Sequence, residues 1–270
     1  MKKLLISLLV VLLLTAGCAQ KVENEEIVVG VVGEHYKYWQ PVIDKLSEEG
    51  ITLTLKVFNE YSIPNQALAQ KEIHMNAFQH YLYLNQEIKE FNYDLAVLAE
   101  TIIDPLGIYS DKYKNMNEVT ENSLVVIPDD VTNGGRALKL LEAAGMIKVD
   151  PAKGYLPSIL DIRENNLNLQ VKNVKADLIP SMLSDVDLAV INGDLAVSYG
   201  KKPAQDSIFL EEVDSKKNPH VKDLINILVV RKEDLQNPNY LKVKEYFQSE
   251  EVINIMDEYY NKAFIPAWKH

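Results

Sequence analysis

Hydrophobic residues recur along the chain with two different periods, and these periods predict an alternation of strands and helices. Residues 27–32 form an apolar run ended by Gly33, the pattern of a strand buried on both faces. Residues 36–49 carry apolar side chains at i, i+3, i+4 and i+7, the spacing of an amphipathic helix, and Gly50 follows as a C-cap candidate. Residues 51–58 alternate apolar and polar side chains, which indicates a second strand.

The same patterns continue along the chain and indicate two units, the second beginning near residue 117. Strands and helices interleave without a Gly/Ser-rich linker, an order typical of α/β folds with helical crossovers. We therefore expect two α/β lobes that face each other across a cleft, where a small ligand usually binds. The remaining predicted strands are 74–78, 95–103, 124–127, 167–174, 188–191, 206–213 and 225–230, and the remaining predicted helices are 65–69, 81–91, 133–144, 176–183, 238–248 and 250–261.

The N-terminus predicts an export signal. Two lysines precede an apolar run at residues 4–14, which is too short to span about 30 Å of hydrocarbon but has the length of a signal-peptide core. The next segment, Leu-Thr-Ala-Gly-Cys, resembles the lipobox of bacterial lipoproteins and ends at Cys18, the only cysteine. This implies a signal peptide at 1–17 and a lipidated tether at 18–26 that holds the protein on the extracytoplasmic side of the cell membrane. The alternative is an ordinary secretory signal with an incidental cysteine.

Composition and charge narrow the class of function. The 270 residues are 47% hydrophobic and 25% charged, as in globular proteins, and the formal net charge of −11 argues against nucleic-acid binding. A single cysteine excludes a disulfide framework and a cysteine-based metal cage. The histidines lack metal-ligand spacing and no nucleophile motif is present, so we expect no metal, no cofactor and no enzymatic activity.

Four consecutive residues, Asn133, Gly134, Gly135 and Arg136, follow an apolar strand and open a predicted helix. Unpaired N–H groups at a helix N-terminus attract anions, and the guanidinium fork of Arg136 matches a carboxylate through two parallel hydrogen bonds. The segment therefore predicts a seat for a carboxylate or phosphate. The competing interpretation is a Gly-Gly turn followed by a solvated arginine.

Aromatic side chains gather between residues 61 and 83, namely Tyr61, Phe78, His80, Tyr81 and Tyr83. Aromatic faces stack on apolar or sulfur-bearing groups, and their hydroxyl groups hold polar ones. The cluster is a candidate ligand pocket. It is also compatible with ordinary core packing, in which His80 makes a structural hydrogen bond.

Two asparagines lie at or within predicted strands. Asn192 follows the strand 188–191, and ligands of open α/β sheets gather at the carboxyl ends of strands. A turn residue that tolerates left-handed backbone is the alternative explanation for Asn192. Asn226 lies inside an apolar strand, where a buried amide needs a partner from either a ligand or the neighbouring backbone.

Several short stretches, taken in order behind the lipobox, resemble the methionine-binding lipoproteins (NlpA-type), the substrate-binding components of methionine ABC importers. They are Phe78-Gln79-His80 with Tyr83-Leu84, residues 105–110, 126–130, 133–138, 185–187, 189–193, 226–231 and 265–267. The resemblance implies a type II periplasmic-binding-protein fold, with two α/β lobes hinged around a ligand cleft. It places residues 27–115 and 226–270 in lobe 1 and residues 116–225 in lobe 2.

The resemblance also implies roles for the candidate residues. Arg136, helped by the helix N-terminus, would bind the ligand carboxylate, and Asn192 and Asn226 would hold the backbone atoms of an amino acid. The side-chain pocket would be aromatic. The full ligand-binding set is Tyr61, Phe78, His80, Tyr83, Asn133, Arg136, Asn192 and Asn226.

The function implied by the resemblance is a lipid-anchored solute-binding protein that binds L-methionine and delivers it to an ABC permease with its ATPase subunits. Departures from the family pattern at Ala77, Leu82, Leu106 and residues 129–131 bear on the side-chain pocket. D-methionine, methionine sulfoxide, a methionine-containing dipeptide and other amino acids are therefore alternative ligands. A third hypothesis is a surface lipoprotein with an adhesive or host-contact role.

Overall fold

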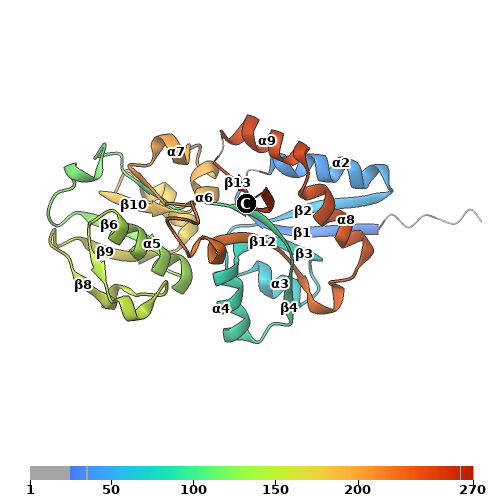
Figure 1. Cartoon of the computed structure of the whole chain (residues 1–270), viewed down its shortest axis with the longest axis horizontal. Coiled ribbons are helices and arrows are strands. Elements are labelled where there is room, and N and C mark those ends of the chain that lie inside the picture. Colours follow the sequence, from blue (N-terminus) through green and yellow to red (C-terminus); the bar gives the residue numbers. More distant parts are fainter. Residues whose placement is uncertain (1–24, 35, 262, 270) are drawn as a thin grey trace, which may run out of the picture.

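Two β-sheets, each covered by helices, form the two halves of the molecule in the computed structural model (Figure 1). The structure describes residues 25–34, 36–261 and 263–269. The predicted signal peptide and Cys18 lie outside these residues, whereas Glu25 and Glu26, predicted to be tether, are the first residues of a strand. Within the described ranges, no helix is both long and apolar enough to cross a membrane.

The first sheet has six strands in the order β13-β4-β12-β3-β1-β2. Strand β1 is parallel to both of its neighbours, as helical crossovers require, whereas β12 is antiparallel to β3 and β4. Residues distant in sequence therefore meet at the sheet's centre. The strands are β1 Glu25–Val32, β2 Ile51–Phe58, β3 Met75–His80, β4 Leu95–Ile103, β12 Ile225–Arg231 and β13 Ile265–Pro266.

The second sheet has five strands in the order β11-β5-β10-β6-β9. Strand β6 is parallel to β9 and β10, and β5 is antiparallel to β10 and β11. A small antiparallel pair, β7 and β8, lies apart from it. The strands are β5 Gly107–Tyr109, β6 Leu124–Pro128, β7 Lys148–Val149, β8 Ile162–Glu164, β9 Gln170–Val174, β10 Leu188–Ile191 and β11 Phe209–Leu210.

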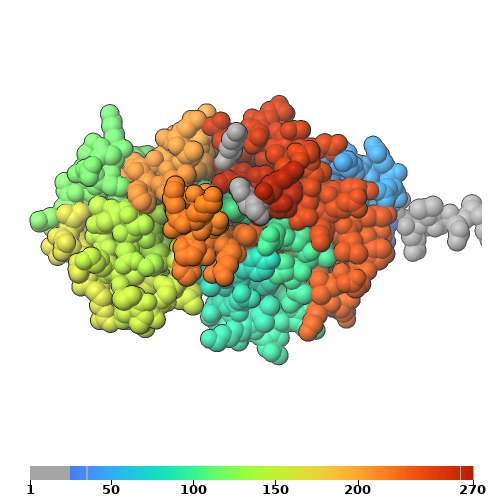
Figure 2. All heavy atoms as spheres, in the orientation of Figure 1, coloured from blue at the N-terminus to red at the C-terminus, as the bar shows by residue number. Residues whose placement is uncertain are grey.

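The strands change sheet twice along the chain, from β4 to β5 and from β11 to β12. Because β5 pairs with β10, the first passage occupies residues 104–106 and precedes the expected boundary at 115. The second passage falls between β11 and β12, which ends it at Ile225. The division of the chain into lobes stays a proposal, and the sheets favour a first boundary near residue 105. In the space-filling view the half that holds the second sheet runs from green through yellow to orange, and the other half is blue to cyan together with orange-red to red (Figure 2).

Helices cover both faces of each sheet (Figure 1). Helices α2, α8 and α9 pack on one face of the first sheet and α3 and α4 on the other. In the second sheet, α5 covers one face, and α6 with a 3-10 stretch covers the other. The helices are α2 Gln40–Glu48, α3 Pro64–Ala69, α4 Tyr81–Phe91, α5 Val131–Ala143, α6 Gly193–Ser198, α7 Pro203–Asp206, α8 Pro238–Phe247 and α9 Glu250–Tyr260.

The predicted strands and helices are largely confirmed, and the differences have local causes. The helix 81–91 and the strand 95–103 are observed at their predicted bounds. The predicted helix 176–183 is a 3-10 helix, Ala176–Met182, with Pro180 inside it, and proline lacks the N–H that an α-helix interior requires. The predicted strand 206–213 is observed only as the two residues of β11, and Asp206 is instead the last residue of α7.

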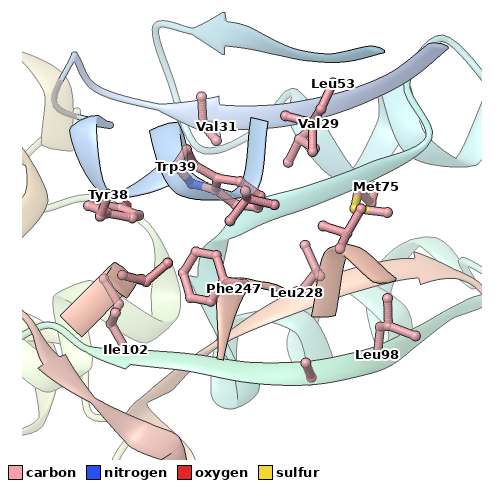
Figure 3. Close-up of a cluster of buried hydrophobic side chains, with 14 of the residues drawn as sticks. Val29, Val31, Tyr38, Trp39, Leu53, Met75, Leu98, Ile102, Leu228 and Phe247 are labelled. Carbon is pink, nitrogen blue, oxygen red and sulfur yellow. The ribbon is translucent and has the colours of Figure 1, made fainter. Parts of the chain in front are cut away.

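The core of the first half joins the two ends of the described chain. Trp39, just before α2, and Phe247, at the end of α8, are buried with ring centroids 4.8 Å apart. Figure 3 shows both rings between β1, with Val29 and Val31 pointing inward, and β4. The C-terminal helices thus complete a core begun by the N-terminal strand.

Removal of the Phe247 ring is expected to destabilise the protein. Phe247→Ala leaves a cavity against Trp39, and such a truncation costs about 3–5 kcal/mol of unfolding free energy. Leu241→Ala on the same helix is the matched control, since Leu241 is exposed and its truncation changes the free energy by about 0.5 kcal/mol or less. Urea unfolding followed by circular dichroism measures both, and equal losses would contradict this account of the core.

Candidate functional site

A cavity lies where the ends of the two sheets meet, and all eight predicted ligand-binding residues line it. Its empty volume is about 290 Å³. The first half contributes residues from the end of β3 and from β12, and the second half contributes residues from α5 and the start of α6. The lining residues are Tyr61, Phe78, Gln79, His80, Tyr83, Asp104, Asn133, Arg136, Asn192, Asp194 and Asn226.

Arg136 is buried and already paired. Its Nε donates to Glu211 Oε1 at 2.8 Å and its Nη2 donates to Glu211 Oε2 at 2.5 Å, so the carboxylate of Glu211 occupies the fork. Nη2 also donates to the carbonyl oxygen of Asp104 at 2.7 Å. Nε and Nη2 are therefore both engaged within the protein, and the carboxylate-binding role of Arg136 stays a prediction. Nη1 has no hydrogen-bond acceptor in the described chain and is the atom left for a ligand.

The N-terminus of α5 is also occupied. Asp130 is the N-cap, and its Oδ1 accepts hydrogen bonds from the backbone N–H groups of Thr132 at 3.2 Å and Asn133 at 2.8 Å. The predicted anion seat at these N–H groups is thus filled by the protein's own carboxylate. The two glycines serve packing, because a Cβ at Gly134 would lie 2.8 Å from the Pro128 carbonyl oxygen and one at Gly135 would lie 2.7 Å from that of Tyr155.

Asn133 joins the two halves through its side-chain amide. Its Oδ1 faces His80 Nε2 at 3.3 Å and accepts a hydrogen bond from Asn192 Nδ2 at 3.0 Å. Its Nδ2 donates to Asp130 at 3.0 Å. Both polar atoms of the amide are used, so Asn133 positions its neighbours across the cavity.

His80 is a neutral, structural histidine. It is the N-cap of α4, and its Nδ1 accepts a hydrogen bond from the N–H of Tyr83 at 3.1 Å, which leaves Nε2 as the donor to Asn133. Burial, together with the positive charge of Arg136, lowers the pKa of His80 to about 3. Among the residues that the structure describes, no group of three or more His, Cys, Asp or Glu side chains is arranged to hold a metal ion.

Asn192 presents a buried acceptor that the protein leaves unused. It precedes α6 with φ −61°, so the turn interpretation based on left-handed backbone is wrong. Its side chain makes no capping hydrogen bond, and Oδ1 is buried with no partner in the described chain. Asn226, opposite His80 in the pairing of β12 with β3, is half-buried and lines the same cavity.

Three rings form an aromatic box at one side of the cavity. Tyr61 stacks on Phe78 with ring centroids 6.1 Å apart, and Tyr83 stands edge-on to both, at 6.4 Å from Tyr61 and 5.8 Å from Phe78. The hydroxyl group of Tyr61 donates to Asp194 at 2.8 Å, which ties the box to the second half. The predicted aromatic cluster is thus assembled, except that Tyr81 points elsewhere and donates to Glu100.

A buried network of side-chain amides supports the strand that carries Phe78 and His80. Asn65 of α3 donates to Gln79 at 2.8 Å and accepts from Asn76 at 2.9 Å, and all three residues are buried. Gln79 donates to Asn76 at 2.9 Å. Satisfied networks of this kind restrict a strand to one arrangement.

Three acidic residues of the site were not predicted. Glu211 binds Arg136, and Asp104 and Asp194 line the cavity. Burial and the nearby Asp194 raise the pKa of Asp104 well above its usual range, and burial raises the pKa of Asp194 to about 6. The available signal for Asp104 was its place directly after the predicted strand 95–103, and for Asp194 its place two residues beyond Asn192. Glu211 lies inside the predicted strand 206–213, where no signal marked it.

A second cavity, with an empty volume of about 550 Å³, borders the first, since Tyr61 and Tyr83 line both. At its rim Lys175 of the second half pairs with Glu60 of the first at 2.8 Å. The ion pair and the Tyr61–Asp194 hydrogen bond both link the halves beside the candidate site.

Comparisons with known proteins agree with one another. A sequence model of the NlpA lipoprotein family matches residues 27–268. The D-methionine-binding lipoprotein MetQ of Salmonella typhimurium is 37% identical over 258 residues, which cover 94% of this chain and 93% of the relative.

Solved structures share this fold over most of the chain. Protein PG110 from Staphylococcus aureus has a TM-score of 0.86 and 40% identity, covering 89% of this chain and 94% of its own. A nutrient-binding protein from Burkholderia cenocepacia bound to methionine has a TM-score of 0.83 and 32% identity, covering 89% and 99%. The expected fold class, two α/β lobes of the periplasmic-binding-protein type, is confirmed by these similarities.

The neutral state of His80 predicts a specific dependence of stability on pH. The folded pKa of about 3 lies below the usual value of 6.5, so the unfolded chain binds one proton more between these pH values. His80 therefore makes stability fall by about 1.4 kcal/mol per pH unit as the pH drops from 6 to 4.

His80→Asn, which retains a side-chain acceptor for the N-cap position, is expected to remove this contribution. Urea titrations of ligand-free protein at several pH values give both slopes. Parallel curves for the wild type and the variant would show that His80 is not buried in its neutral form.

Proposed function

Because the chain belongs to the NlpA lipoprotein family, we propose that it is an extracytoplasmic solute-binding protein that binds methionine between its lobes and delivers it to an ABC importer. The observation that carries the proposal is the cavity between the two halves. It combines an unused guanidinium N–H, an unpaired amide oxygen and an aromatic box. These groups match the carboxylate, the amine and the thioether side chain of methionine.

Each group has one role in this proposal. Nη1 of Arg136 donates to the ligand carboxylate, with the half-buried amide of Asn226 beside it. Oδ1 of Asn192 accepts from the ligand amine, because a buried acceptor without a partner costs free energy that a ligand N–H restores. The rings of Phe78, Tyr61 and Tyr83 surround the side chain, since aromatic rings contact sulfur favourably.

The lobes are proposed to close on the ligand. Three contacts between the halves accompany closure, namely Tyr61 to Asp194, His80 to Asn133 and Lys175 to Glu60. A ligand that touches both halves favours the closed state by the difference between its affinities for the two states. We propose that the ligand leaves unchanged, because the relatives are substrate-binding proteins.

The membrane and transporter partners follow from the family. We propose that Cys18 is lipidated after cleavage of residues 1–17 and holds the protein at the cell surface. The mass of the N-terminal peptide from a membrane fraction tests this directly. The permease and its ATPase subunits are proposed as the acceptors of the ligand.

The identity of the ligand is tested by mass spectrometry of protein purified without added ligand and then denatured. Release of methionine is expected, and a ligand at one hundred times its Kd stabilises the folded protein by about 2.7 kcal/mol, which thermal unfolding detects. The panel includes D-methionine, methionine sulfoxide, a methionine-containing dipeptide and leucine. Stabilisation by leucine alone, or by none of them, would refute methionine as the ligand.

Arg136→Lys is expected to weaken methionine binding by about tenfold or more. A lysine retains the charge opposite Glu211, but its single ammonium group lacks the planar fork that reaches Glu211 and a ligand together. Arg163→Lys is the matched control, because Arg163 forms an exposed ion pair with Asp150. Calorimetric titration measures both affinities, and wild-type binding by Arg136→Lys would refute the carboxylate role.

A further inference from the structure

Among the residues that the structure describes, one ion pair joins the two halves. Lys175 Nζ of the second half lies 2.8 Å from Glu60 Oε2 of the first. The other ion pairs of the described chain connect groups of the same half or of the second passage between the sheets. The side chains are 33% exposed for Glu60 and 57% exposed for Lys175, so solvent and salt reach the pair.

The strand order places this ion pair far from the passages between the sheets. Glu60 lies two residues beyond β2, and Lys175 directly follows β9. In each sheet, β2 or β9 is the edge strand farthest from the strands that the passages connect, which are β4 with β5 and β11 with β12. A rotation of the halves about the passages therefore separates Glu60 from Lys175 more than groups beside the passages.

The segment that carries Glu60 is attached to the second half at two points. Tyr61, the next residue, donates a hydrogen bond to Asp194 at 2.8 Å, while Glu60 pairs with Lys175. Glu60, Tyr61 and Lys175 line the cavity of about 550 Å³, and Tyr61 also lines the candidate ligand cavity. Separation of the halves on this side requires both contacts to break.

The ion pair and the ligand cavity are distinct. Neither Glu60 nor Lys175 lines the cavity that holds the candidate ligand-binding residues. A change in the pair therefore alters the balance between joined and separated halves without removing a ligand contact. An exposed ion pair shifts such an equilibrium by a factor of about two to five.

We propose that Glu60 and Lys175 form an ionic latch that slows the separation of the lobes and thereby sets the lifetime of the ligand-bound state. This inference rests on the proposed function and adds two residues that control release of the ligand. Because the latch forms only when the halves are together, its loss accelerates ligand release and leaves association unchanged. The affinity falls by the same factor as the release rate rises.

The latch is tested by stopped-flow fluorescence with L-methionine as the ligand. Glu60→Gln and Lys175→Met are each expected to release L-methionine about threefold faster than the wild type, with association rate constants that stay within about twofold. The double variant is expected to release no faster than either single variant, because both substitutions remove the same interaction. A double variant in which the two effects multiply would contradict a direct pair.

Lys148→Met is the matched control. Lys148 pairs with Glu164 at the same distance of 2.8 Å, but both residues belong to the second half and both are exposed. The substitution thus removes one lysine and one exposed ion pair without touching the contact between the halves. Its release rate is expected to equal that of the wild type, and an increase like that of Lys175→Met would show that loss of charge alone is responsible.

Salt provides a second measurement that needs no substitution. Raising sodium chloride from about 10 mM to about 1 M shortens the Debye length from about 30 Å to about 3 Å. We expect release from the wild type to accelerate about threefold over this range and release from the two latch variants to change little. Salt-independent release from the wild type, or wild-type release rates in both latch variants, would overturn the latch while methionine binding stands. Absence of methionine binding would refute the proposed function, and the latch with it.

Discussion

The buried ion pair between Arg136 and Glu211 is the constraint on which the site depends. Burial of two charges is expensive unless the remaining polar atoms are satisfied, and here the N–H of Leu106 and the carbonyl oxygen of Asp104 complete the set. The pair thereby fixes helix α5, strand β11 and the first passage between the sheets to one another. The residues of the second half that line the cavity are therefore positioned relative to this ion pair.

Some polar groups of the cavity have their partner in the same half, as Arg136 has in Glu211, others have it in the other half, as Tyr61 has in Asp194, and a few have none. Asn133 holds His80 and Asn192 through Oδ1 and donates from Nδ2 to Asp130, and Oδ1 of Asn192 has no donor in the described chain. The unsatisfied atoms carry a cost only while they are buried, and they are buried because the halves are together. A ligand that supplies donors thus favours the closed arrangement over any open one, by an amount equal to its differential affinity.

Local patterns in the sequence were sufficient to predict most strands and helices, because the hydrophobic periods of these elements extend over many residues. They were insufficient for β5, whose three residues are too few to show a period, and for the 3-10 helix around Pro180. In the candidate site, the aromatic and amide residues were predicted because their chemistry is visible one residue at a time. Their acidic partners were not predicted, because these contacts are created only by the fold. Arg136 and Glu211 are 75 positions apart in the sequence, and Asp104 and Asp194 are 90 positions apart.

The position of the acid pair links recognition of charge to the joining of the halves. Asp104 ends the strand that leaves the first sheet, Asp194 lies on α6 of the second half, and Tyr61 reaches Asp194 from the first. Bringing the halves together therefore buries two carboxylates side by side, which repel each other and lose solvent. A ligand group that donates hydrogen bonds to this pair would offset part of both costs, so ligand binding and the joining of the halves are coupled at this point of the cavity.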